Sequence, residues 1–175
     1  MVKEILTSLG NDLVVFTLNN QYYAISIAHV VQIIEMVTIT PIPQISPVVA
    51  GMINVRGTSL PVINMRRYIG LSDMAIHLHT PIILVQIPLN NGMQQLGMIV
   101  DEVVDVMQAA SDAITQMPDI LPQALRDTPL VQGVVHTSDG ALTILLDLSQ
   151  LFESGDSIAE IVSRIEIPSM ALENG

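Results

Sequence analysis

Four pairs of short apolar strands, each pair joined by a tight turn, run through this chain and restrict it to a mainly β fold. The turn segments, in chain order, are 19–20, 56–58, 90–92 and 138–140. Apolar side chains alternate with other residues on both sides of each turn, which is typical of paired strands with one buried face. The turns contain Asn and Gly, which accept positive φ angles at low cost.

The hairpins fall into two similar halves. When Gly57 is aligned with Gly140, the strands that follow the two glycines match; aligning Ala24 with Gly97 has the same effect on an earlier pair of strands. This repetition indicates an internal duplication, with chance similarity between short apolar strands as the alternative. Because each half has too few strands for a secure core of its own, we expect the halves to pack as two lobes of one domain.

Helical content should be small. Ser26 can cap a short helix over 27–34, where apolar residues recur at helical spacing. Asn64 and Asp147 can each cap the turn that follows a strand, and Gly70 can end the first of these turns.

Near the end of the chain, a second helix is predicted. Ser157 and Glu160 form a capping-box pattern, and Pro168 marks the start of a loose tail. The apolar stripe of this helix consists of Ile158, Ile161, Val162 and Ile165.

Prolines mark interruptions of the strand pattern. Pro41, Pro43 and Pro47 indicate an extended connection. Pro61 lies inside a strand pattern, and since proline cannot donate to a ladder, its strand is expected at a sheet edge or at a bulge.

Charge and composition exclude several classes of partner. Six Lys and Arg against 17 Asp and Glu give a formal net charge of −11, which repels phosphate backbones and anionic lipid headgroups and argues against nucleic acid or direct membrane insertion. The absence of cysteine excludes disulfides and thiolate metal sites. No apolar stretch approaches the ~20 residues of a membrane span, and no signal peptide is readable.

No catalytic constellation is apparent. His77 and His79 have ligand-like spacing, but no further ligand adjoins them, so we expect both in a solvated loop. The carboxylates of Asp101, Glu102 and Asp105 lack the pattern of a calcium loop and are expected in a solvated turn. The sequence therefore predicts no catalytic, cofactor or metal site and no enzymatic activity.

Arg56 is unusual because it occupies a tight hairpin tip in a strongly acidic chain. A guanidinium in that position projects five donors of fixed geometry. Arg56 is either an ordinary turn residue or a polar anchor at a protein interface, where Arg is enriched.

The segment around Arg56 resembles the signature of CheW-like domains. It reads Gly-x-x-Asn-x-Arg-Gly at 51–57, followed by Leu-Pro-Val-Ile-Asn-Met-Arg at 60–66. The strands at 13–18 and 96–103 support the likeness, which covers roughly 12–152. The resemblance implies two intertwined SH3-like five-stranded β-barrel subdomains, a few short helices and a C-terminal helix.

In domain terms, the resemblance implies subdomains at approximately 12–80 and 81–152 that share strands and enclose a groove. An N-terminal extension would occupy 1–11, and the C-terminal helix and flexible tail 153–175.

The same resemblance implies a non-enzymatic scaffold in bacterial chemotaxis, cytoplasmic and recruited to membrane receptor arrays. Its partners would be the cytoplasmic tip of methyl-accepting chemoreceptors and the regulatory domain of a CheA-type histidine kinase. One alternative is a CheW-like adaptor of a pilus-motility or developmental pathway. Another is a small β-barrel hydrolase or metal protein that uses His77, His79 and the carboxylates at 101–105.

Carried over by position, the resemblance also implies protein-binding residues. The family often has Glu at the position of Gln32, which can accept a hydrogen bond from Arg56 but cannot form an ion pair with it. For each valine in the set, core packing is the alternative role. The implied contacts are Val30, Gln32, Arg56 and Gly57 in the first lobe and Ile83, Val103 and Val106 in the second.

Overall fold

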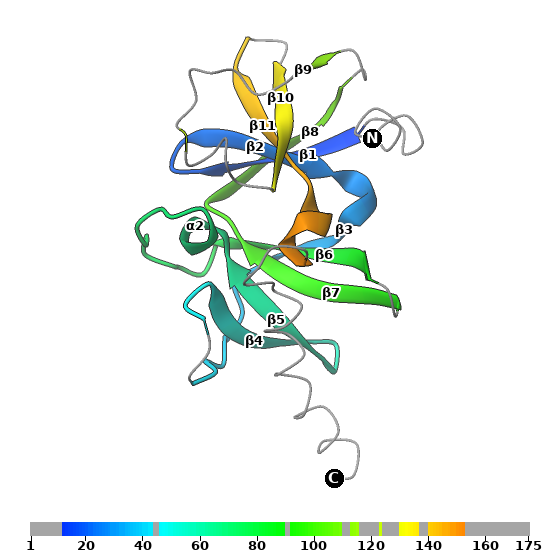
Figure 1. The fold of residues 1–175 in the computed structure, drawn as a ribbon. Coiled ribbons are helices and arrows are strands. Elements are labelled where there is room, and N and C mark those ends of the chain that lie inside the picture. The colour runs from blue at the N-terminus through cyan, green and yellow to red at the C-terminus, as the bar shows by residue number, and fades with distance from the viewer. Residues whose placement is uncertain are drawn as a thin grey trace.

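Two β-sheets form the body of the protein, one above the other in Figure 1. The computed structural model describes residues 12–43, 46–89, 92–109, 113–115, 123, 130–136 and 140–152. The predictions for 1–11 and 153–175, including the C-terminal helix, lie outside these residues. No helix in the described part of the chain is long and apolar enough to span a membrane.

The upper sheet of Figure 1 has six strands among the described residues. In spatial order they are β8 (Glu102–Gln108), β1 (Asp12–Leu18), β2 (Gln21–Ser26), β11 (Leu142–Leu146), β10 (Val131–His136) and β9 (Ile114–Thr115).

The lower sheet has five strands in the described part of the chain. In spatial order they are β3 (Val30–Glu35), β6 (Pro81–Leu89), β7 (Gly92–Ile99), β5 (Thr58–Asn64) and β4 (Val49–Val55).

The two halves of the sequence exchange strands between the sheets. In the lower sheet β5 runs parallel to β7 and places Val62 opposite Gly97. In the upper sheet β11 runs parallel to β2 and places Leu145 opposite Ala24. These two pairs are equivalent in the sequence alignment of the halves. The predicted mainly β fold of two intertwined subdomains is confirmed, with the two-residue β9 as a sixth strand in the upper sheet.

Matching glycines allow a close backbone approach in both sheets. A Cβ atom at Gly51 would lie 2.3 Å from the carbonyl oxygen of Thr40, and one at Gly133 would lie 2.5 Å from that of Thr115. Each glycine adjoins a shift in strand register. Only a residue without a side chain lets a neighbouring segment come this close to the irregularity.

The principal core lies between the two sheets. It contains fully buried side chains from the upper sheet, such as Phe16 and Ile25, and from the lower sheet, such as Ile83 and Met98. Full burial of one such side chain contributes about 1.5–3 kcal/mol. Two smaller apolar clusters of the described residues draw on the strands of the upper and lower sheet respectively.

The helix predicted over 27–34 is wrong beyond its first turn. Ser26 does cap, since its Oγ accepts a hydrogen bond from the Ala28 backbone N–H at 3.3 Å. The helix is a single 3₁₀ turn at Ile27–His29, and Val30–Glu35 forms β3. Most residues of β3 are β-branched and pair with β6, which outweighs their helical spacing.

For the strand that contains Pro61, an edge or a bulge was predicted: the edge is wrong, because β5 is interior, but a register shift in the β4–β5 pairing does begin at Val62, next to Pro61. β5 lies between β7 and β4. Opposite Pro61, the Met52 backbone N–H and carbonyl both bond to Thr40, which lies on the other side of β4, at 2.9 Å. Pairing with β7 begins only at Val62. The missing N–H of proline therefore breaks no ladder bond.

The caps predicted after β5 and β11 are confirmed. The Asn64 side chain accepts a backbone hydrogen bond from α2 (Met65–Tyr68), and Gly70 follows with a φ of +84°. The Asp147 carboxylate accepts one at the start of the 3₁₀ helix η3 (Leu148–Phe152).

Candidate protein-binding surfaces

Two edge strands carry the same arrangement of exposed apolar side chains. β3 ends the lower sheet and β8 ends the upper one, and the two strands are equivalent in the alignment of the halves. Val31 and Ile33 on β3 are 51% and 42% exposed; Val104 and Val106 on β8 are 46% and 48% exposed. Edge strands also have free backbone hydrogen-bonding groups, so these surfaces, the β3 edge (Val30–Glu35) and the β8 edge (Glu102–Gln108), are suited to another protein.

On the β3 edge, the residues implied by the resemblance are only half-buried. Val30 packs against the principal core, and Gln32 lies opposite Leu84 of β6. The two most exposed apolar residues, Val31 and Ile33, were missed. The alternation of β3 would have revealed them if the segment had been read as a strand.

On the β8 edge, Val106 is exposed as implied, while Val103 is half-buried against the principal core. Val104, equivalent to Val31, was missed. Ile83 does not belong to the exposed surface of the isolated chain, because its side chain is 0% exposed in the principal core. Its strand, β6, is interior to the lower sheet, with β3 and β7 on either side.

Arg56 and Gly57 form the exposed tip of the β4–β5 hairpin. Their φ angles are +52° and +84°, the signature of a type I′ turn. The Gly57 backbone N–H donates to Asn54 Oδ1 at 2.9 Å. Among the hydrogen bonds of the described residues, none joins Arg56 in the β4–β5 turn to Gln32 on β3.

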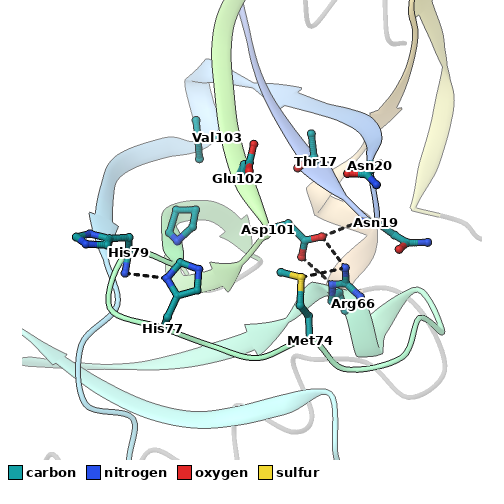
Figure 2. A pocket seen from close by; sticks show the side chains of 11 residues that line it. Thr17, Asn19, Asn20, Arg66, Met74, His77, His79, Asp101, Glu102 and Val103 are labelled. Atoms are coloured by element: carbon teal, nitrogen blue, oxygen red, sulfur yellow. Dashed lines mark hydrogen bonds and ion pairs between the residues drawn. The ribbon is translucent and has the colours of Figure 1, made fainter.

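A partly buried ion pair joins α2 to the connection between β7 and β8 (Figure 2). Arg66 of α2 donates from Nε and a terminal nitrogen to the two carboxylate oxygens of Asp101, each at 2.7 Å. Asp101 also accepts from the Asn19 backbone N–H in the β1–β2 turn at 2.7 Å. It lies where the chain passes from β7 of the lower sheet to β8 of the upper one.

The environment of Asp101 favours its charged form. Burial alone would raise the pKa of this carboxyl, but the hydrogen bonds from Arg66 and Asn19 together outweigh it and lower the pKa. The hydrogen bond to Asp101 in turn raises the pKa of Arg66. The solvated turn predicted at 101–105 is therefore wrong: Asp101 is largely buried, and Glu102 and Asp105, although exposed, lie in strand β8. Sequence could not reveal a partner that lies at position 66.

A pocket of about 740 Å³ opens beside this ion pair. Its walls come from the β1–β2 turn, α2, the loop before β6 and the start of β8, so it lies between parts of the two sheets (Figure 2). The lining is Thr17, Asn19, Asn20, Arg66, Met74, His77, His79, Pro81, Asp101, Glu102 and Val103.

His77 and His79 lie in an exposed loop, as predicted. The His79 backbone N–H donates to His77 Nδ1 at 3.2 Å, and His79 Nδ1 lies 3.4 Å from Glu35 Oε2. No group of three or more His, Asp or Glu that could hold a metal ion occurs among the residues that the structure describes. This arrangement offers a metal ion too few ligands.

Comparisons with known proteins agree on one family. A family model described as the CheW-like domain matches residues 12–156. The chain is 34% identical over 157 residues to the chemotaxis protein CheW of Bacillus subtilis (strain 168), covering 90% of this chain and 95% of the relative. It is 28% identical over 149 residues to the chemotaxis protein CheW of Rhizobium meliloti (strain 1021), with coverage of 85% and 92%.

A solved structure has the same fold. It is the crystal structure of scaffolding protein TtCheW from Thermoanaerobacter tengcongensis, which matches with a TM-score of 0.71 and 30% sequence identity. The match covers 84% of this chain and 95% of that one.

Proposed function

Because the chain belongs to the CheW-like domain family, we propose that it is a non-enzymatic scaffold that couples methyl-accepting chemoreceptors to a CheA-type histidine kinase in bacterial chemotaxis. The names of its relatives support a chemotaxis role, and the description of TtCheW supports a scaffolding one. The protein would act in the cytoplasm and be recruited to receptor arrays at the membrane.

The observation that carries this proposal is the presence of two similar apolar edges on different sheets. A coupling protein must bind two partners at once, which requires two separate surfaces. The β3 and β8 edges meet this requirement because each ends its own sheet and exposes an equivalent apolar pair. Burial of such side chains in the centre of an interface is a principal source of binding free energy.

The Arg56–Gly57 turn would add a polar contact at the rim. Arg56 is exposed and makes no side-chain hydrogen bond with the residues described. Its guanidinium is therefore available to a carboxylate or backbone carbonyl of a partner.

Substitutions on single edges test the proposal. Ile33→Asp should weaken binding at the β3 edge, and Val106→Asp at the β8 edge, each by at least about tenfold, because a carboxylate would have to be buried unpaired. Met93→Asp is the matched control, since Met93 is 57% exposed but lies on neither edge. Binding is measured to a kinase regulatory domain and to a receptor cytoplasmic fragment. The proposal fails if the folded native chain binds neither, or if Met93→Asp weakens binding as much as the edge substitutions.

A further inference from the structure

The β3 and β8 edges share their apolar pattern but differ in charge. In the alignment of the halves, Gln32 on β3 is equivalent to Asp105 on β8, and His29, just before β3, is equivalent to Glu102. Gln32 and Asp105 each follow a register shift against the neighbouring strand. The β8 edge therefore carries two carboxylates at positions where the β3 edge carries none.

Neither of these two carboxylates is compensated. Glu102 and Asp105 are exposed, and neither takes part in an ion pair with another described residue. Asp105 Oδ1 accepts a hydrogen bond from the backbone N–H of its neighbour Val106 at 2.8 Å, which leaves its charge in place. The one carboxylate of the β3 edge, that of Glu35, has Oε2 3.4 Å from His79 Nδ1. Uncompensated negative charge therefore distinguishes the β8 edge.

The pocket beside the Arg66–Asp101 ion pair opens at the start of β8. Glu102 and Val103 of the β8 edge form part of its lining (Figure 2). The Arg66 guanidinium already donates to both carboxylate oxygens of Asp101, so these two charges cancel. Glu102 adds a negative charge that no other Arg or Lys side chain of the lining offsets. With a volume of about 740 Å³, the pocket has room for a basic side chain of a bound partner.

The β8 edge fits a protein segment that carries Lys or Arg beside its apolar side chains. Exposed valines are buried favourably against apolar surface, and carboxylates at an interface require opposite charge. A second copy of the chain is a poor occupant, because the formal net charge of −11 repels it. Of the arginines that the structure describes, Arg66 and Arg67 are already in ion pairs, and only Arg56 is not. The charges therefore favour a different protein with a basic segment.

We propose that the β8 edge selects a partner protein whose binding segment carries Lys or Arg beside apolar side chains, with one basic side chain in the pocket next to Glu102. The β3 edge would bind the other partner mainly through apolar contacts. This inference rests on the proposed function, because it specifies which partner each of the two edges accepts. Opposite charges accelerate association with the correct partner, whereas a wrong partner leaves the carboxylates of Glu102 and Asp105 unpaired at the interface.

Salt dependence tests the proposal, with a kinase regulatory domain and a receptor cytoplasmic fragment as probes. The partner of the β8 edge is identified by Val106→Ser, which removes apolar surface without adding charge. Between about 50 mM and about 500 mM NaCl, the affinity of this partner should fall by about tenfold or more, and that of the other partner by less than about threefold.

Neutral substitutions locate the charge. At low salt, Glu102→Gln and Asp105→Asn should each weaken binding of the β8 partner by about threefold or more. Asp73→Asn is the matched control, because it removes the same charge from an exposed carboxylate that lies on neither edge; it should leave both affinities unchanged. Gln32→Asp combined with Asp105→Gln keeps the net charge of the chain and should still weaken binding of the β8 partner.

The outcomes separate this inference from the proposed function. Equal salt dependence of the two partners, or equal losses from Asp73→Asn and Asp105→Asn, would overturn the inference and leave the proposed function intact. No effect of Glu102→Gln would remove the pocket from the interface. Self-association of the native chain that Asp105→Asn weakens would assign the β8 edge to a second copy and refute the basic partner. If neither probe binds the folded native chain at any salt concentration, the proposed function fails and this inference with it.

Discussion

At the scale of single residues, the contacts that the sequence could not predict are those between segments far apart in the chain. The cap at Asn64 was predictable because donor and acceptor are neighbours in the chain. The ion pair of Arg66 with Asp101 was not, since the two positions are brought together only by the parallel pairing of β5 with β7, which places Asn64 opposite Ile99. For the same reason the need for glycine at 51 and 133 became visible only with the carbonyl oxygens beside them.

Gly133→Ala should destabilise the fold through a backbone clash. Its new Cβ would lie 2.5 Å from the carbonyl oxygen of Thr115, an atom fixed by the pairing of β9 with β10. We expect a loss of about 3 kcal/mol in the free energy of unfolding, measured in urea. Gly140→Ala is the control, because its φ of +86° is strained for alanine but nothing lies near its Cβ; it should cost about 1 kcal/mol. Similar losses for both variants would contradict this explanation.

Asp101→Asn should change how stability depends on pH. The folded-state pKa of Asp101 is lowered, so its contribution is fully present above the unfolded pKa of about 4 and disappears as the pH falls through the folded value. At pH 7 the variant should lose about 1–2 kcal/mol, because charged hydrogen bonds to Arg66 and Asn19 are weakened. Unfolding curves between pH 2 and 7 should converge for the two proteins at the acid end. A constant difference across this range would show that the carboxylate charge is not responsible.

At the scale of elements, hairpins were more predictable than isolated strands. Each hairpin is marked by its own turn residues, and all four pairs of strands occur in the structure. β3 has no such turn partner: it pairs with β6, which lies about fifty residues further along the chain. Its sequence therefore fitted a helical period equally well. This single misassignment also hid Val31 and Ile33, the most exposed apolar residues of the β3 edge.

In the β4–β5 hairpin, a substitution of Arg56 can distinguish an effect on stability from an effect on partner binding. The residue has a φ of +52°, which Asn adopts at lower cost, and Asn-Gly is the preferred pair for a type I′ turn. Arg56→Asn should therefore raise the free energy of unfolding by about 0.5–1 kcal/mol while partner binding weakens. Thermal unfolding and titration with each partner measure the two effects. Unchanged affinity for both partners would remove Arg56 from the interface.

At the scale of the whole molecule, the exchange of strands explains why two similar halves form one body. β5 completes its sheet against β7, and β11 completes the other against β2, so each sheet needs strands from both halves. The duplication was visible in the sequence because aligned glycines and apolar runs repeat. The sequence could not predict which face of β3 and β8 points outward, because that face is determined by the packing of the two complete sheets. The result is a molecule with two equivalent apolar edges on two different sheets.

The most direct test of the account is whether both edges can be occupied at once. Sedimentation of the native chain with a kinase regulatory domain and a receptor cytoplasmic fragment should reveal a ternary complex. Ile33→Asp and Val106→Asp should each abolish this complex yet retain one binary complex, and the retained partner should differ between the two variants. If the partners displace each other from the native chain, or if both variants lose the same partner, the two edges do not act as separate binding surfaces.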